Sequence, residues 1–208
     1  MTSVKTFDKK ATTWDQNPER NKLVENAAKI ISRTIEIAPN FNLLDYGSGT
    51  GLLGFQFIDK AQSVTFCDTS EGMLEQVKKK RDAHRYENVN ILKTDFLSDD
   101  LPQQRFDVIA SMLVLHHINN LDVLLSKFNQ ALHAGGYFCW IDMDEEDGSF
   151  HSNNEGIAHF GFSRKIVEKL LHENGFAIHT FDSSLKYRKE TKKGEYHFPI
   201  FVAIAQKL

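Results

Sequence analysis

Cysteine is scarce in this sequence, with only two among 208 residues. Both Cys67 and Cys139 lie inside apolar, strand-like runs, where a cysteine behaves as a small buried hydrophobe. We therefore expect both cysteines to be free thiols. Free thiols in place of a disulfide favour a cytoplasmic protein.

Long apolar runs and a strong excess of charge are also absent. No apolar run approaches the ~20 residues that a membrane-spanning helix needs, and residues 1–6 show no apolar signal region. The net charge is −3 and the isoelectric point is near 6.3, whereas a general nucleic-acid binder usually has a basic domain. We therefore expect neither a membrane nor a nucleic acid as a partner.

A glycine-rich turn is the feature around which the chain is organised. An apolar run ends at Asp45, and Gly47, Gly49 and Gly51 follow at alternate positions before a further apolar segment begins. This order predicts a strand, a tight turn and a helix N-terminus. Glycine has no Cβ and tolerates positive φ, so a ligand can approach the backbone closely at such a turn and meet free N–H donors.

Polar side chains end the later apolar runs as well. Asp68 ends the run over 64–68, Asp95 and Phe96 end a third, and Ser111 ends a fourth. The carboxyl ends of the strands form the binding edge of a doubly wound sheet. At that edge Asp45 can face a cationic group, Asp68 can accept from ribose hydroxyls, and Asp95 with Phe96 can hold a base. Several such sites in register favour a nucleoside-containing cofactor.

Together these residues resemble the class I S-adenosylmethionine-dependent methyltransferases, and within them the small-molecule group called type 11/12. The resemblance implies transfer of a methyl group by in-line displacement from S-adenosyl-L-methionine to a small-molecule acceptor, with S-adenosyl-L-homocysteine as product. It implies one domain over 1–208, with residues 1–38 as an N-terminal arm and helix that act as a lid. The cofactor-binding positions would be Trp14, Asp45, Gly47, Ser48, Gly49, Thr50, Gly51, Asp68, Thr69, Met73, Asp95, Phe96 and Ser111.

Hydrophobic periodicity predicts strands that alternate with helices, which is typical of an α/β fold with a parallel sheet. We expect an irregular arm over 1–17 and a helix that begins at Pro18, is capped by Asn17 and is stopped by Pro39-Asn40. The resemblance implies a Rossmann-like three-layer sandwich with strand order 3-2-1-4-5-7-6 and strand 7 antiparallel. The expected strands are 42–46, 63–67, 89–94, 106–112, 137–141, 176–181 and 200–205. The other expected helices run from the glycine turn to about 60, over 71–84, from 121 to Gly135-Gly136, and from Ser163 to about 174.

His116 and His117 follow the fourth strand and are candidates for a catalytic role. An imidazole there could position the substrate or remove a proton from it, or the pair could simply pack against the following helix. The acidic stretch over 142–147 could bind a cation or attract a cationic substrate, but for most of it a solvated loop is the simpler interpretation. Asp142 and Asp144, nearest the strand end, are the exceptions, and Asp144 is a further candidate for a catalytic role. No regular ligand spacing appears, so we expect no metal.

Two segments are free to roof the site, because the sheet supplies only its floor. These are the N-terminal arm and the irregular stretch over 142–162, and a stretch of that length in a compact domain is often functional. The arm is polar yet carries Phe7 and Trp14. The residues that we expect near the acceptor are Trp14, His116, His117, Asp144 and His151.

Two other classes of function are compatible with the same glycine turn. Residues 49–54 fit the dinucleotide fingerprint, and Asp68 lies about 20 residues further on, as in nicotinamide-dependent oxidoreductases. Asp45 beside the turn and Asp95 on the third strand argue against that class. A non-catalytic module that binds a cofactor or a partner is the second alternative.

Overall fold

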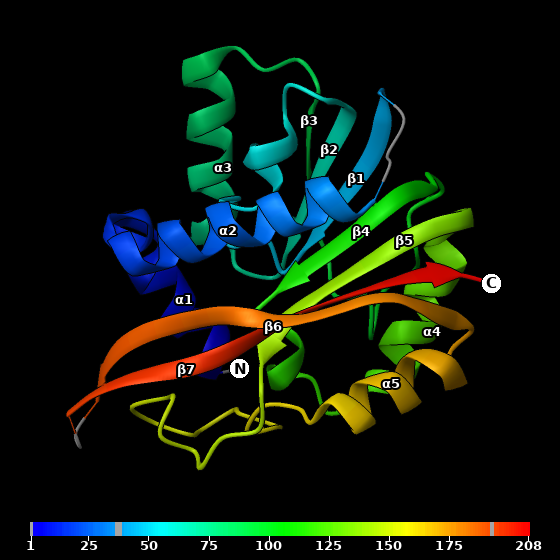
Figure 1. The fold of residues 1–208 in the computed structure, drawn as a ribbon. Helices are drawn as coiled ribbons and strands as arrows, with labels where there is room; N and C mark the ends of the chain where they lie inside the picture. The colour runs from blue at the N-terminus through cyan, green and yellow to red at the C-terminus, as the bar shows by residue number, and fades with distance from the viewer. Residues whose placement is uncertain (1, 36–38, 192–193) are drawn as a thin grey trace.

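A seven-stranded sheet forms the centre of the computed structural model, which describes residues 2–35, 39–191 and 194–208 (Figure 1). The strand order β3-β2-β1-β4-β5-β7-β6 confirms the expected topology, and β7 runs antiparallel to both of its neighbours. The strands are β1 (Phe41–Tyr46), β2 (Ala61–Asp68), β3 (Val89–Lys93), β4 (Phe106–Met112), β5 (Leu132–Met143), β6 (Phe176–Thr191) and β7 (Gly194–Lys207).

Helices cover both faces of the sheet, which gives the three layers (Figure 1). On one face lie α2 (Pro18–Thr34) and α3 (Glu71–His84), and on the other lie α4 (Leu121–Ala131) and α5 (Arg164–Glu173). Successive residues of β1 point to opposite faces, so Leu43 joins the first apolar cluster and Leu44 the second. Both are almost fully buried, as expected for a central strand with helices on both sides.

Three helices begin directly after a residue whose side chain caps them. The Asn17 side chain accepts from the Arg20 N–H at 3.0 Å, Ser70 caps α3, and Asn120 caps α4. The helix α2 ends at Thr34, before the expected stop at Pro39, and residues 36–38 lie outside the described residues. The helix α4 ends at Ala131, so the expected stop at Gly135-Gly136 is wrong, and these glycines lie within β5.

The expected irregular arm over 1–17 is also wrong, because this segment forms α1 (Thr2–Lys10) and the 3-10 helix η1 (Ala11–Gln16). Tertiary contacts stabilise it where its sequence shows no apolar stripe. The Asp8 carboxylate accepts from the Ser70 hydroxyl at 2.6 Å and from the Gly72 N–H at 2.9 Å. These groups belong to the start of α3, where the helix dipole favours a negative charge.

The helix expected from the glycine turn to about residue 60 is replaced by the short 3-10 helix η2 (Gly54–Phe57) and turns. The Gly54 N–H donates to the Asp45 carboxylate at 2.9 Å, which takes this donor out of a helical ladder. The Phe55 ring packs on Phe66 with centroids 4.6 Å apart, and Phe57 packs on Phe41 at 6.5 Å. Side-chain packing therefore decides the conformation here.

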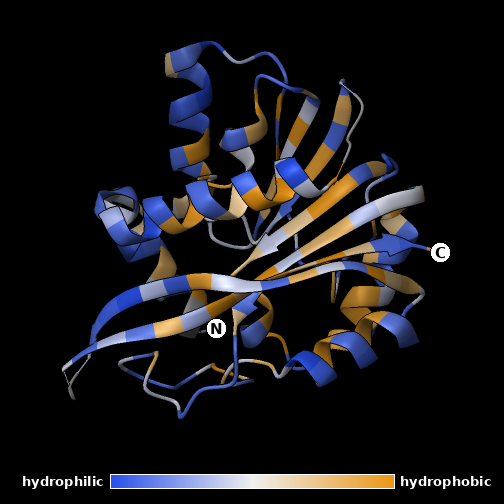
Figure 2. Ribbon diagram, in the orientation of Figure 1, coloured by the Kyte–Doolittle hydropathy of each residue, from blue (hydrophilic) through white to orange (hydrophobic). Residues whose placement is uncertain are grey.

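The last two strands are much longer than expected and form an arm that reaches past α2 (Figure 1). The outer part of the arm is largely hydrophilic (Figure 2). Leu185 and Tyr187 are nevertheless buried, whereas Lys186 and Arg188, which alternate with them, are exposed. This period of two is the strand signal that the charged residues concealed.

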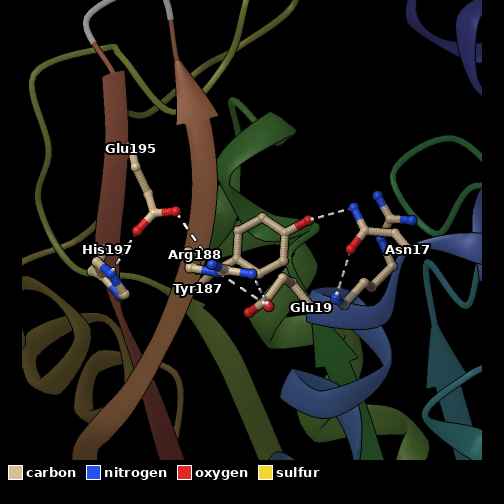
Figure 3. A network of polar contacts seen from close by, with 7 residues as sticks. Asn17, Glu19, Tyr187, Arg188, Glu195 and His197 are labelled. Atoms are coloured by element: carbon tan, nitrogen blue, oxygen red, sulfur yellow. Dashed lines mark hydrogen bonds and ion pairs between the residues drawn. The ribbon is translucent and has the colours of Figure 1, made fainter.

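A polar network fastens the arm to the start of α2 (Figure 3). Asn17 Nδ2 donates to the Tyr187 hydroxyl at 3.2 Å, and the Arg188 guanidinium lies 2.9 Å from Glu19 and 3.2 Å from Glu195. The arm thereby becomes a wall beside the carboxyl ends of the strands. In the described part of the chain, no helix combines the length and the apolarity needed to cross a bilayer.

Candidate active site

A cavity of about 330 Å³ lies over the glycine turn, at the carboxyl ends of β1, β2 and β4. We call it the turn cavity. Most of the residues expected to bind a cofactor line it, although they come from segments far apart in the sequence. They are Trp14, Asp45, Gly47, Ser48, Gly49, Thr50, Asp68, Thr69, Met73 and Asp95, and His117 lines it too.

The glycines of the turn adopt the left-handed backbone that glycine favours. The φ angle is +67° at Gly47 and +53° at Gly49. A Cβ at Gly47 would collide with Val114. A Cβ at Gly49 would lie 3.8 Å from the Trp14 Nε1 and 3.9 Å from the Met73 sulfur, so it would project into the turn cavity without a clash.

Two carboxylates at the strand ends hold the turn in shape. Asp68 accepts from the Gly49 N–H at 2.7 Å and from the Ser70 N–H at 2.8 Å. Burial raises the pKa of Asp68, and these hydrogen bonds partly offset the rise. Burial also raises the pKa of Asp45 to about 7, against the Gly54 N–H that favours its charged form. Both acids keep lone pairs that a bound ligand can use.

Three expected cofactor residues lie outside the lining of this cavity. Gly51 is required for packing, because a Cβ there would lie 2.8 Å from the Phe66 ring. Phe96 is fully buried, with its ring centroid 5.1 Å from that of Tyr46. The Ser111 hydroxyl is buried and donates to the Tyr46 carbonyl at 3.0 Å. These three residues therefore stabilise the strand ends by packing and hydrogen bonding, outside the cavity.

The N-terminal segment closes the turn cavity from above. The Thr50 hydroxyl donates to Asp15, which also forms an ion pair with Lys80 at 2.6 Å. The Arg20 guanidinium stacks 3.8 Å from the centre of the Trp14 ring and donates to the Trp14 carbonyl. Arg20 thus holds Trp14 directly, and Asp15 fastens the segment that carries Trp14 to the turn and to α3.

A second and larger cavity of about 880 Å³ adjoins the first, and we call it the outer cavity. Its walls come from the N-terminal segment, the loop over 144–162 and the β6–β7 arm. The Phe7 ring packs edge-on against Trp14 at 5.7 Å and against His117 at 5.8 Å. Five residues line both cavities and form the shared wall: Phe7, Trp14, Arg20, Leu113 and His117.

A histidine cluster stands beside this wall. The short helix η3 (Leu115–His117) carries two members, and His151 approaches from the loop over 144–162. His116 is buried, with its Nδ1 2.7 Å from an Asp142 carboxylate oxygen and its Nε2 3.2 Å from the His151 Nε2. Burial lowers the pKa of His117 to about 4 and that of His151 to about 3, so both imidazoles are neutral at neutral pH.

The loop over 144–162 is anchored to the same short helix. The N–H groups of Ala158 and His159 both donate to the His116 carbonyl, at 2.9 and 3.0 Å. Asp144, which we expected near the acceptor, lies outside both cavity linings, and its N–H donates to the Pro199 carbonyl at 3.1 Å. Trp14, His116, His117 and His151 do line the outer cavity.

Several residues of the site have no signature in the sequence. The pairing of Asp142 with His116 joins positions 26 apart through adjacent strand ends. Leu113 lines both cavities with a φ of +55°, a conformation that an apolar residue rarely adopts. Arg20 and Arg188 also line the outer cavity, and neither belongs to a recognisable motif. The β6–β7 arm also lines the outer cavity, and the alternation of apolar and charged residues around Tyr187 is the one sequence signal that could have predicted it.

Relatives of known class share this chain's sequence pattern. A family model described as a methyltransferase domain matches residues 37–193. An uncharacterized methyltransferase of Geobacillus sp. strain WCH70 is 23% identical over 83% of this chain and 88% of its own length. Another, from Geobacillus thermodenitrificans, is 31% identical over 48% of this chain, and the match spans about half, 46%, of that relative's length.

The fold has close counterparts among solved structures. A SAM-dependent methyltransferase from Aquifex aeolicus superposes with a TM-score of 0.73 at 19% identity, over 97% of this chain and 98% of its own. At this identity the likeness establishes the fold, and the family match establishes the class. The chain belongs to the class I S-adenosylmethionine-dependent methyltransferases.

Proposed function

We propose that this chain binds S-adenosyl-L-methionine in the turn cavity and transfers its methyl group to a small organic acceptor in the outer cavity. The observation that carries the proposal is the shared wall. Phe7, Trp14 and His117 line both cavities, so ligands in the two spaces would meet there. Family membership supports the methyl donor, and the cavity pair supports a second, separate ligand.

The residues of the turn cavity fit the proposed cofactor. The Ser48 hydroxyl is buried in its lining and has no hydrogen-bond partner among the described residues, as expected for a group that a ligand satisfies. Asp68 and Asp95 can accept from the ribose hydroxyls and the adenine amino group. A sulfonium cation would be favoured beside the Phe7 and Trp14 rings and near Asp45.

The outer cavity suits a polar small molecule. Its volume of about 880 Å³ falls in the usual range for small-molecule sites, ~300–1,000 Å³. Charges of both signs line it, which favours an acceptor with polar groups over a purely apolar one. The lining charges are Lys10, Glu19, Arg20, Glu155, Arg188, Lys189, Glu190 and Glu195.

The main contribution of the protein would be alignment. When bound, the cofactor supplies a methyl group whose bond to sulfur breaks, with the electron pair left on sulfur, as the acceptor bonds to carbon and releases its proton. The wall residues would exclude water, and His116 and His117 would orient the acceptor. Alignment of this kind can supply up to ~7–11 kcal/mol in the best intramolecular cases. The two buried free thiols support a reducing, cytoplasmic setting.

Titration and turnover together test this function. Calorimetry should show S-adenosylmethionine binding and no comparable binding of NADH, which separates the methyltransferase from a nicotinamide enzyme. Incubation with a panel of polar small molecules should then release S-adenosylhomocysteine for at least one acceptor. Tight NADH binding would contradict the proposal. Binding of S-adenosylmethionine without turnover on any acceptor would favour the non-catalytic module.

A further inference from the structure

The three imidazoles at the wall have the composition of a metal site. His116, His117 and His151 each offer a ring nitrogen, and these three nitrogens all lie within 4.8 Å of one another. All three residues line the outer cavity. We propose that this cluster binds one divalent transition-metal ion of the zinc class, with an open coordination position toward the outer cavity.

The spacing of the ring nitrogens suits such an ion. Two histidine nitrogens at ~2.0–2.1 Å from a tetrahedral zinc ion lie ~3.3–3.4 Å apart. The Nε2 atoms of His116 and His151 are already 3.2 Å apart. The ring nitrogen of His117 lies no more than 4.8 Å from those of the other two histidines. It therefore has to approach them by roughly 1.5 Å at most to reach the nitrogen–nitrogen distance of a tetrahedral site. His117 and His151 are only half-buried, so their rings can rotate by this amount.

The surrounding groups orient the imidazoles as they do around bound metals. The Asp142 carboxylate holds the His116 Nδ1–H at 2.7 Å, which leaves the Nε2 lone pair for an ion. The Met143 N–H also donates to Asp142, at 2.9 Å, and fixes that carboxylate in turn. The His117 Nδ1 lies 3.3 Å from the Gly156 carbonyl, an interaction that frees its other nitrogen in the same way.

The donor set selects the class of ion. Three imidazole nitrogens without a coordinating carboxylate suit zinc and its neighbours in the first transition row, whereas magnesium and calcium prefer oxygen ligands. Three protein ligands are also the usual number where a fourth position stays open for a small molecule. An ion here would hold an oxygen-bearing acceptor beside the shared wall and ease the loss of its proton. This role rests on the proposed function, but the binding of the ion does not.

Zinc titration of the untagged protein in the absence of S-adenosylmethionine tests the site. Calorimetry with a competing chelator should give one zinc ion per chain, and cobalt should give the visible absorption bands of a tetrahedral site. His151→Ala and His117→Ala should each weaken zinc binding by at least ~100-fold. Asp142→Asn, which keeps the ligands, should weaken it by ~10–100-fold. His172→Ala, which removes an exposed imidazole on α5, should leave it unchanged.

Each of these results shows whether the histidine cluster binds zinc, and none of them depends on methyl transfer. Circular dichroism shows whether a variant is folded, and S-adenosylmethionine titration of His151→Ala shows whether the turn cavity is intact. If the wild type binds no zinc in the micromolar range, the cluster is only hydrogen-bonded and the proposal fails. Zinc bound equally by wild type and His151→Ala would also overturn it, since the ion would then lie elsewhere.

Discussion

The turn cavity and the outer cavity lie side by side but are built in opposite ways. The floor of the turn cavity consists of backbone turns and carboxylates at the ends of neighbouring parallel strands, such as Asp45 and Asp68. The outer cavity is assembled from an N-terminal helix, a long loop and a hairpin arm, in which Asn17 meets Tyr187. The first is fixed by strand geometry, and the second by docking of distant segments.

Under the proposed function, this difference indicates how the two cavities would divide the binding of cofactor and acceptor. A cofactor common to a whole family needs a site that the fold itself supplies, whereas an acceptor needs a site that can vary without disturbing the sheet. The shared wall is where the two constructions meet. Substitutions at the glycine turn should therefore weaken binding of the cofactor alone. Substitutions in the loop over 144–162 or in the β6–β7 arm should weaken binding of the acceptor.

The largest effect should come from blocking the turn cavity. Gly49→Val places a branched side chain against Trp14 and Met73, in the space of the turn cavity. We expect S-adenosylmethionine affinity to fall by about 100-fold or more, which is ~2.8 kcal/mol. Calorimetry measures it. Zinc binding at the histidine cluster should be unchanged.

Gly135→Val is the matched control for that variant. Gly135 has a φ of +72°, and an added Cβ there would lie 3.7 Å from the Gln206 side-chain nitrogen, so the backbone strain is similar and there is no clash. It lies outside the turn cavity lining. A comparable loss of affinity in both variants would mean that strain, and not filling of the cavity, causes the effect.

A smaller but clear loss should follow from Asp68→Ala. Charge-assisted hydrogen bonds to the ribose hydroxyls are worth roughly 1.5–3 kcal/mol, so affinity for S-adenosylmethionine should drop about tenfold or more. Asp107→Ala is the control, because the Asp107 carboxylate also accepts a backbone N–H, from Asn42 at 2.8 Å, and lies outside the cavity lining. An unchanged dissociation constant for Asp68→Ala would remove this residue from the binding site.

The sequence predicts the turn cavity well and the outer cavity poorly, for physical reasons. Glycines and acids at strand ends, with caps such as Asn17 and Ser70, are local signals that one strand or turn can satisfy. The docking of α1 depends on Asp8 meeting the start of α3, 62 positions away. The long arm depends on weak alternation around Leu185 among many charges. A local pattern can indicate a strand, but it does not show which distant segment that strand contacts.

Hydrogen exchange should distinguish the two segments that cover the cavities, the N-terminal segment and the loop over 144–162. The N-terminal segment lines the turn cavity through Phe7 and Trp14, whereas the loop over 144–162 lines only the outer cavity. Saturation with S-adenosylmethionine should therefore slow exchange in residues 4–17 more than in residues 144–162. Equal exchange with and without the cofactor in both segments would show that neither is a ligand-responsive lid.

A separate prediction, on stability and not on binding, concerns the cost of burying Asp45. Its native pKa of about 7 lies above its ordinary value of 3.8, so the folded state binds this proton more tightly than the unfolded state. Its contribution to the free energy of unfolding therefore falls as pH rises from about 4 to about 7. In urea unfolding without ligand, the stability of Asp45→Asn relative to wild type should rise across that interval. A constant difference would mean that Asp45 titrates normally.

A crystal structure with S-adenosylhomocysteine tests the central claim most directly, namely that cofactor and acceptor occupy opposite sides of one wall. We expect the ribose beside Asp68, the adenine near Asp95, and the sulfur directed at the wall formed by Phe7, Trp14 and His117. The outer cavity should stay open to an acceptor. A ligand seated in the outer cavity, or one whose sulfur points away from the wall, would contradict the account.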